Sequence, residues 1–582
     1  MGQLVFEKPS KARFLFEGTM GERVKANLEN WLLRAPVANP GMIEMFRLRD
    51  RKPKPDLVPW AGEFVGKYLI SAIQALRMTR SHDLDVLIRR VIAELIDCQA
   101  DDGYLGPFTR EERLLGHWDL WGHYHWMLAL MMWHEDTGDA EALNCVIRAA
   151  DLVCRTYLDT DRQVLDAGSH EMNMAIIHVL GWLYRETGIE RYWLMMRQIE
   201  KEWEQAGDYF RAGLAKTEFF RTPKPRWESL HDVQGLVELY QITGDERYKT
   251  AFENLWWSIQ RYDCHNTGGF STGEKAVGDP YAQGAIETCC TTAWMALTVD
   301  MLRLTGNPIA ADELELSTWN SVLASQHPSG RWWTYDTPMD GVRQASAHSI
   351  VFQARPGTPE LNCCSVNGPR GLGMLSEWAM MVDEEGVIVN YYGPMEADLR
   401  LPDDMDVKLI QKTDYPVGGH INLLVLPKQA SSFNLRLRIP QWSKETTVRV
   451  NGVTVEPVNA GSYLFIDRMW HQNDTVEIEF DMSLRREPGE RAYKGHVSIY
   501  LGPLLLAYDQ HLNDIDPDDV PALDTTQLDA TPAESNGQFQ PIVLLKLKAA
   551  DGRPVCLCDF ATAGAYGTHY RSWIPKMGLQ AQ

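Results

Sequence analysis

The chain has 582 residues, of which 45% are hydrophobic and 23% charged, and its formal net charge is −22. This length and composition predict a globular protein of two to four domains with a substantial buried core. Acidic and basic residues are interspersed, and no block of Lys or Arg offers a track for phosphates. The composition therefore disfavours nucleic acid and anionic membranes as partners and favours a neutral or small ligand.

The amino-terminal segment, residues 1–8, lacks the basic region and the apolar stretch of a signal peptide. No run of about 18 apolar residues, the length that spans a membrane, occurs in the sequence. We therefore expect a cytoplasmic protein that does not cross a membrane. The 20 Trp and 21 Tyr residues, together with many carboxylates, are usual in proteins that stack sugar rings, although large cores also use Trp.

Up to about residue 385 the sequence pattern is helical, and apolar-periodic segments end repeatedly in a Thr-Gly pair. The Gly of each pair fits the left-handed backbone position that follows a helix C-terminus. The pairs recur at intervals of about 50 to 60 residues, the length of two helices and two loops. They are Thr137-Gly138, Thr187-Gly188, Thr243-Gly244 and Thr305-Gly306. Repeated helical hairpins of this size predict an α/α solenoid or a closed α/α toroid.

After Glu385-Gly386 the pattern changes to short alternating runs of apolar and polar residues, which are typical of β-strands. The dipeptide Asn451-Gly452 is a strong signal for a two-residue hairpin turn. We therefore expect a multidomain α+β protein with a helical domain at residues 1–385, a β-sandwich domain at residues 386–496 and a second β-sandwich region at residues 497–582.

Each repeated helix carries, near its start, a polar residue of a kind that is unusual in a hydrophobic core. These residues are His123, His170, His231 and Cys289. Equivalent ends of repeated helices face the same rim, where the helix N-termini favour anionic groups, including thiolates. A single His of this kind is more often a satisfied core or surface imidazole, but four coincident positions favour a functional rim.

Glu287 and Cys289 form an E-x-C pair, and Cys363-Cys364 lies shortly before a second apolar helix. In a chain without a secretory signature, thiols clustered near helix starts indicate a metal site rather than disulfides. Three thiolates and a carboxylate would make a closed tetrahedral zinc site. The alternative is a set of buried free thiols with an incidental Cys-Cys pair, because the spacing is not that of a zinc ribbon.

The loop at residues 267–274 places Glu274 among glycines shortly before the E-x-C pair. Such a loop can bring a carboxylate to a substrate, and it can equally be a solvated turn. Spacing alone assigns no role to Glu274.

Several segments resemble signature segments of glycoside hydrolase family 127, the β-L-arabinofuranosidase family, over most of the chain. They are residues 60–67, residues 102–106, Glu287-Thr288-Cys289, Cys363-Cys364 with Asn367 and Arg370, residues 439–442, Asn451-Gly452 and Trp470. The resemblance implies an (α/α)6 barrel catalytic domain followed by β-sandwich domains. It also implies a retaining mechanism in which a cysteine attacks the sugar.

The resemblance further implies roles for single residues. Zn²⁺ would be bound by Glu287, Cys289, Cys363 and Cys364. Cys363 would also be the nucleophile, which the metal holds as a thiolate at neutral pH, and Glu274 would be the general acid/base. The groups that bind the sugar would be His123, His231, Glu315 and Tyr335.

The chain departs from the family pattern beside the reacting centre. Family members commonly have Pro-Pro after the cysteine pair, where this chain has Ser365-Val366. Cys290 is an additional thiol that could compete for the metal, and the segment between Glu274 and Glu287 is shorter. These departures leave the mechanism in place and leave the sugar open.

We expect an exo-acting glycosidase that releases a terminal β-L-arabinofuranosyl-like residue from plant-derived oligosaccharides. A homodimer is one assembly that we consider. The first alternative is a related glycosidase acting on another furanoside, such as a branched acidic sugar of pectin side chains. A second makes Glu287 the nucleophile beside a purely structural zinc. A third is a non-catalytic carbohydrate-binding or scaffold protein.

Overall fold

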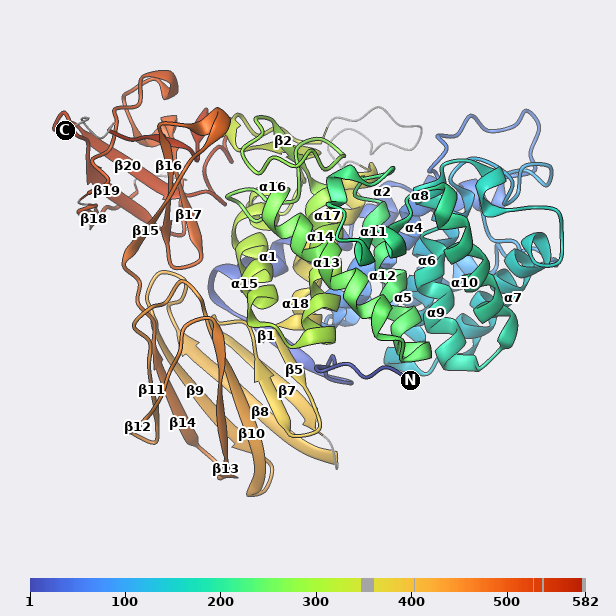
Figure 1. Ribbon diagram of the computed structural model, residues 1–582, viewed down its shortest axis with the longest axis horizontal. Helices are drawn as coiled ribbons and strands as arrows, with labels where there is room; N and C mark the ends of the chain where they lie inside the picture. Colours follow the sequence, from blue (N-terminus) through green and yellow to red (C-terminus); the bar gives the residue numbers. More distant parts are fainter. Residues whose placement is uncertain (347–360, 402–403, 527, 536–538, 578–582) are drawn as a thin grey trace.

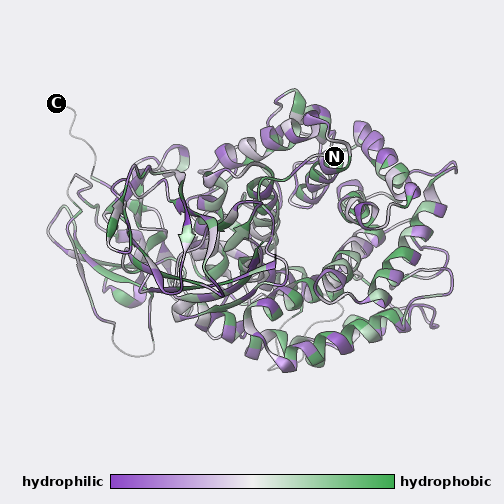
Figure 2. Ribbon diagram, turned by 90° about the horizontal axis from the view of Figure 1, so that it is seen from below, coloured by the Kyte–Doolittle hydropathy of each residue, from purple (hydrophilic) through white to green (hydrophobic). Residues whose placement is uncertain are grey.

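The computed structural model describes residues 1–346, 361–401, 404–526, 528–535 and 539–577 (Figure 1). Within them, six helices form an inner ring in which each packs on the next and the last packs on the first. They are α4 (Glu63–Thr79), α6 (Asp119–Thr137), α9 (Ile176–Thr187), α12 (Ser229–Thr243), α14 (Thr288–Thr305) and α17 (Cys363–Gly373). The ring is closed, so the predicted toroid is confirmed, and Figure 2 shows the helices arranged around it.

Each of the first five inner helices is followed by an outer helix that packs against it. The outer helices are α5 (His82–Ile96), α7 (Ala140–Tyr157), α10 (Glu190–Glu202), α13 (Glu246–Tyr262) and α15 (Pro308–Leu316). Inner helices such as α6 are buried nearly all round, whereas α5 buries only one stripe, which includes Leu84, Ile88 and Val91. A two-layered ring explains both patterns, since only the inner layer has neighbours on every side.

The predicted Thr-Gly helix ends are confirmed. Gly138, Gly188, Gly244 and Gly306 all have positive φ angles between 63° and 75° and follow α6, α9, α12 and α14. Three of the outer helices then begin at once on a capping side chain, supplied by Asp139, Asp245 and Asn307. The hairpins are therefore short, and they keep the six inner helices parallel, with their N-terminal ends at one mouth of the ring.

Strand β1 and the described strands of residues 380–479 form a seven-stranded and a four-stranded sheet that share one hydrophobic core with the helices. The seven-stranded sheet has the order β1 (Arg13–Phe16), β7 (Met395–Leu401), β8 (Met405–Thr413), β9 (His420–Pro427), β14 (Asp474–Glu479), β11 (Thr447–Val450) and β12 (Val453–Val455). The other sheet has the order β13 (Ser462–Trp470), β10 (Ser431–Ile439), β6 (Gly386–Val389) and β5 (Met380–Val382). Asn451 and Gly452 both have positive φ angles and join β11 to β12, as the sequence predicts.

A third sheet lies at the carboxyl-terminal end (Figure 1). Its main path is β15 (Leu484–Pro488), β16 (His496–Leu501), β17 (Leu504–Asp509), β20 (Pro554–Asp559), β19 (Leu544–Lys548) and β18 (Ala530–Pro532). Because β15 pairs with β16, the boundary expected at residue 496 falls inside this sheet. Likewise β1 and β5, which we assigned to the helical domain, pair with strands of the sandwich.

The strand β1 pairs with β7, so the chain enters the sandwich before it builds the ring. Long-range strand pairing of this kind leaves no local signature in the sequence. None of the described helices has the length and apolar character that a membrane span requires.

Candidate metal centre and active site

Glu287, Cys289, Cys363 and Cys364 come together at the N-terminal mouth of the ring. Their ligand atoms all lie within 4.8 Å of one another. Sγ of Cys364 is 3.5 Å from Sγ of Cys289, 4.0 Å from Sγ of Cys363 and 3.4 Å from a carboxylate oxygen of Glu287. The described residues contain no disulfide, and these sulfurs are too far apart for one. The four residues could hold a metal ion.

Two helix starts and one short strand bring the four ligands together. Glu287 ends β2 (Ala285–Glu287), which pairs with β3 (Asp336–Pro338), and Cys289 lies in the first turn of α14. Cys363 and Cys364 are the first two residues of α17. Because helix N-termini carry partial positive charge, both starts favour thiolates.

The start of α17 is capped by a reciprocal pair of hydrogen bonds. The backbone N–H of Ser365 donates to the side-chain oxygen of Asn362 at 2.9 Å, and the backbone N–H of Asn362 donates to the Ser365 hydroxyl at 2.8 Å. A proline at position 365 has no N–H and no hydroxyl, so it could make neither bond. Ser365 therefore has a structural purpose in this chain.

Cys363 differs from the other ligands in its exposure. Glu287, Cys289 and Cys364 are buried, whereas Cys363 is half-buried. Its sulfur lies 3.4 Å from the hydroxyl oxygen of Tyr335. Hydrogen bonds from the Cys289 and Cys364 thiols lower the pKa of Cys363 well below its usual value, while burial raises the pKa of both neighbours. Cys363 is thus the most exposed residue of the four, and its thiol is the one whose pKa is lowered.

The predicted residue Glu274 lies on a loop beside the cluster. The N–H of Gly273 donates to the carbonyl of Ala285 at 3.1 Å, which holds the loop against β2. The Glu274 carboxylate is 42% exposed and accepts a hydrogen bond of 2.5 Å from Arg226. Arg226 also binds Glu228, a buried carboxyl whose pKa burial raises to about 7.

Cys290 lies next to the cluster without belonging to the group of four. Its thiol donates to the carbonyl of Gly273 at 3.3 Å and lies 3.8 Å from the second carboxylate oxygen of Glu287. The additional thiol therefore contacts both the Glu274 loop and one ligand.

The predicted histidines His123 and His231 are buried near the start of α6 and of α12. Nδ1 of His123 lies 2.8 Å from the carbonyl of Asp119, and Nδ1 of His231 lies 2.8 Å from the amide oxygen of Gln234. Nε2 of each ring has no hydrogen-bond partner among the described residues. Buried polar atoms of this kind are normally satisfied by a ligand or by water.

His170, the remaining histidine of the expected rim, begins a separate short helix, α8 (His170–Asn173), and not the inner helix α9. His125, which the sequence did not single out, is fully buried on α6, and neither ring nitrogen has a partner among the described residues. Burial lowers the pKa of His125 and of His231 well below the usual range, so both imidazoles are neutral.

Sequence reasoning also missed an ion pair between Glu63 and Lys67 at the start of α4. Nζ of Lys67 lies 2.9 Å from the Glu63 carboxylate, and both side chains are buried. The Lys67 ammonium lies 5.2 Å from the centre of the Trp227 ring. Its positive charge adds to the lowering of the pKa of Cys363 and offsets part of the rise that burial causes in the pKa of Cys289. Oppositely charged residues four apart in an apolar helix were the signal that could have revealed this pair.

The structure does not bring Glu315 to the cluster, contrary to the role that we expected. Its carboxylate lies 2.8 Å from Arg438 on β10 and accepts hydrogen bonds from the Tyr415 hydroxyl at 2.5 Å and from the Trp442 indole at 3.3 Å. Glu315 lies on the outer helix α15, and its partners belong to the sandwich. Its charge is therefore used at the junction of two domains.

Comparison with known proteins gives two family matches. The model of the GH127 β-L-arabinofuranosidase catalytic domain matches residues 23–377, and that of the GH127 middle domain matches residues 386–482. No curated protein matches the chain.

Solved structures match over nearly the whole chain. A GH127 β-L-arabinofuranosidase from Geobacillus stearothermophilus T6 is 21% identical, covers 97% of this chain and 99% of its own, and superposes with a TM-score of 0.80. A GH127 β-arabinofuranosidase is also 21% identical, with coverage of 99% and 98% and a TM-score of 0.79. At these identities the structures show a common fold.

Proposed function

The chain belongs to the glycoside hydrolase family GH127 of β-L-arabinofuranosidases, and we propose that it is an exo-acting, retaining glycosidase with Cys363 as its nucleophile. We propose that it releases a terminal β-L-arabinofuranosyl-like residue from plant-derived oligosaccharides. The observation that carries the proposal is the position of Cys363, the most exposed residue of the four, whose sulfur lies 3.4 Å from the Tyr335 hydroxyl.

Glu287, Cys289, Cys363 and Cys364 are the residues that would hold the metal, and their spacing fits Zn²⁺. With Zn–S distances of about 2.3 Å, a tetrahedral site separates two sulfurs by about 3.8 Å. The separations of 3.5 Å and 4.0 Å lie on either side of this value. When bound, zinc keeps the sulfurs deprotonated and makes Cys363 a better leaving group.

In the first step, the Cys363 sulfur attacks the anomeric carbon of the bound sugar. The bond from that carbon to the leaving oxygen breaks, and Glu274 gives a proton to this oxygen. Glu274 then takes a proton from water, whose oxygen attacks the same carbon and releases the Cys363 thiolate. Two successive inversions retain the configuration of the sugar.

The groups around Cys363 support these steps. Arg226 orients the Glu274 carboxylate, and the exposed position of that carboxylate leaves it open to a substrate and to water. The free Nε2 atoms of His123 and His231 are suited to sugar hydroxyls, and the Tyr335 hydroxyl lies beside the attacking sulfur. Glu287 is less suited to be the nucleophile, since it is buried among the other ligands.

A panel of p-nitrophenyl glycosides tests the proposal with the wild type, Cys363→Ala and Glu274→Gln. We expect the wild type to hydrolyse the β-L-arabinofuranoside and both variants to lose most of that activity. Unchanged hydrolysis by Cys363→Ala would contradict the cysteine mechanism. Activity only on an acidic furanoside would move the substrate to that class, and no activity on any furanoside would favour a binding protein.

Metal analysis tests the site itself. We expect about one zinc per chain in the purified protein and loss of activity on chelation, with recovery when zinc is added. Far less than one zinc, together with full activity in chelator, would contradict the proposed metal site.

A further inference from the structure

The imidazole of His231 is held by a chain of hydrogen bonds that leads into the helical ring. Nδ1 of His231 lies 2.8 Å from the amide oxygen of Gln234, and the amide nitrogen of Gln234 donates to a carboxylate oxygen of Asp300 at 2.6 Å. All three side chains are buried. The chain therefore connects the proposed sugar site with the interior of the ring.

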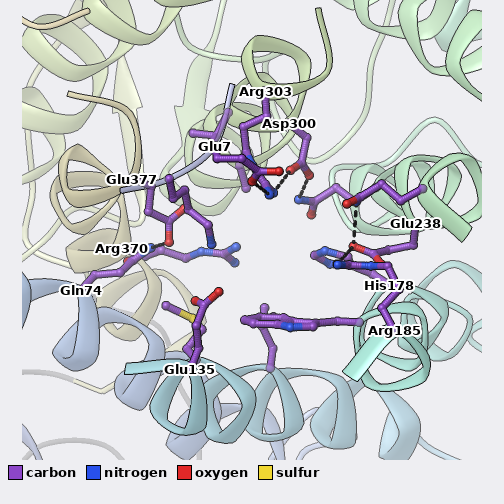
Figure 3. A pocket seen from close by; sticks show the side chains of 18 residues that line it. Glu7, Gln74, Glu135, His178, Arg185, Glu238, Asp300, Arg303, Arg370 and Glu377 are labelled. Carbon is purple, nitrogen blue, oxygen red and sulfur yellow. Dashed lines mark hydrogen bonds and ion pairs between the residues drawn. The ribbon is translucent and has the colours of Figure 1, made fainter. Parts of the chain in front are cut away.

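The other end of this chain lies at a cavity of about 170 Å³, which is lined by residues of all six inner helices, Gln234 and Asp300 among them. Asp300 and Arg303 lie side by side on its wall (Figure 3). Nη1 of Arg303 is 3.4 Å from the second carboxylate oxygen of Asp300. Because the guanidinium is always protonated and a carboxylate carries no hydrogen, Asp300 only accepts hydrogen bonds here.

This acceptor sets the direction of both hydrogen bonds in the chain. Since Asp300 only accepts, the NH2 group of the Gln234 amide faces it, and the amide oxygen faces His231. An amide oxygen accepts, so the single proton of the neutral His231 ring lies on Nδ1. Nε2 of His231, which has no partner among the described residues, therefore presents a lone pair.

The Tyr124 hydroxyl is compatible with this direction. Its oxygen lies 3.1 Å from Nδ1 of His231 and 3.1 Å from Nδ1 of His178. A hydroxyl has a proton to give and lone pairs that accept, so it can donate to His178 while His231 donates to Gln234. The contact of His231 with Gln234 is the shorter one, at 2.8 Å. Gln234 is therefore the partner that decides the tautomer of His231.

We propose that Gln234 and Asp300 are positioning residues, which set His231 to accept a hydrogen bond from a hydroxyl of the sugar. The inference rests on the proposed function, in which His231 binds the sugar. His123 reaches the same state more simply, since its Nδ1 lies 2.8 Å from the backbone carbonyl of Asp119, which only accepts. Both rings therefore select a hydroxyl that donates, and they disfavour an ether or a carboxylate at the same positions.

Replacing Asp300 by Asn tests the direction of the chain. In Asp300→Asn the new amide turns its oxygen to Arg303 and its NH2 group to Gln234, whose own amide then rotates and donates to Nδ1 of His231. We expect the His231 proton to move to Nε2 and kcat/KM on the p-nitrophenyl β-L-arabinofuranoside to fall by about tenfold or more.

A second change should rescue this variant. Gln234→Glu combined with Asp300→Asn keeps the charge of the pair and exchanges the positions of amide and carboxylate. A carboxylate at position 234 accepts from both neighbours, so the proton of His231 returns to Nδ1 and kcat/KM recovers. A residue that only fills space would give no such rescue.

Nitrogen-15 NMR on the purified, full-length protein labelled at histidine shows the tautomer directly, without a sugar. The signals of His231 are identified by their loss in His231→Gln. The matched control is Glu377→Gln, which removes a carboxylate from the same cavity (Figure 3). Glu377 accepts its hydrogen bond from Gln74 at 2.8 Å and is not part of the His231 chain, so this variant should leave the His231 signals unchanged.

The two measurements separate this inference from the proposed function. A His231 proton on Nε2 in the wild type, or an unmoved proton in Asp300→Asn, would overturn the inference whatever the substrate is. Failure of the double variant to recover would also overturn it. If the proton moves as expected but the wild type hydrolyses no furanoside, the chain is supported and the proposed function is contradicted. The wild-type spectrum decides the outcome if Asp300→Asn fails to fold.

Discussion

Burial decides which of the clustered thiols is able to react. Cys289 and Cys364 are buried, and the Cys290 thiol donates a hydrogen bond to the carbonyl of Gly273. Cys363 alone among these four combines partial exposure with a contact to the Tyr335 hydroxyl. Adjacent cysteines of the same chemical type therefore receive different roles from their surroundings.

Replacing Cys363 by Ser tests this assignment at the level of one atom. We expect kcat/KM to fall by about 10³-fold or more, because an alcohol is a far weaker nucleophile and metal ligand than a thiolate. Steady-state kinetics and zinc content measure the change. The control is Cys290→Ser, which should stay within about tenfold of the wild type; a larger loss there would give Cys290 a part in the reaction.

Among the elements, helix α17 presents two ligands because its start is capped. The side chains of Asn362 and Ser365 each accept a hydrogen bond from the other residue's backbone N–H. This cap fixes the direction in which the side chains of Cys363 and Cys364 point from the helix. The cap thus explains why this chain has Ser365 where family members commonly have proline.

The cap can be removed in two steps. Ser365→Ala loses the hydroxyl and Ser365→Pro loses both hydrogen bonds, so we expect a larger decrease in Tm for the proline, corresponding to about 1 to 2 kcal/mol. Calorimetry gives Tm, and metal analysis shows whether zinc is retained. Equal Tm values for the proline variant and the wild type would mean that the cap does not stabilise α17.

Helix α15 carries a carboxyl that makes stability depend on pH. Burial raises the pKa of Glu313 to about 7, although Gln260 donates a hydrogen bond to it at 3.0 Å. The folded state therefore holds this proton more tightly than the unfolded state, so stability falls as pH rises from about 4.5 to 7. We expect Glu313→Gln to reduce this fall in Tm. An unchanged pH profile would contradict the assignment.

In the whole molecule, charge pairs join the helical ring to the sandwich. Arg438 on β10 is fully buried and binds Glu315 and Asp312 of helix α15. The same arginine donates to the carbonyl of Asn390 at 2.7 Å. A buried arginine with these partners makes the two domains depend on each other for stability.

Arg438→Met should uncouple the domains. It leaves two buried carboxylates without their partner, which costs about 3 to 5 kcal/mol. We expect calorimetry to show two separate transitions. The control is Arg436→Met on the same strand, because Arg436 pairs with Asp383 and Glu385 and not with residues of helix α15. A single transition at the wild-type temperature would contradict this account.

The same junction bears on the role of Glu315. If its carboxylate only binds Arg438, Glu315→Gln lowers Tm and leaves KM for the sugar nearly unchanged. A strong rise in KM at an unchanged Tm would restore the sugar-binding role that the resemblance implied.

Two properties of the whole protein stay predictions. Cell fractionation would test the cytoplasmic location, and sedimentation velocity would test the homodimer. Neither property enters the arguments about the metal centre or the cavity.

Local interactions explain what the sequence by itself determined. Helix periodicity, the left-handed Gly at each helix end and the Asn451-Gly452 turn act over a few residues, so they can be recognised without the fold. They predicted the repeated hairpins and the change to strands. The residue types at Glu287, Cys289 and Cys363-Cys364 likewise indicated a metal site.

Only the tertiary structure decided which distant residues meet and how deeply they are buried. Closing the ring placed the Glu63–Lys67 pair near the cysteines. Packing of α15 on the sandwich directed Glu315 away from the cluster. Burial and long-range approach depend on the whole chain at once, so no local pattern in the sequence records them.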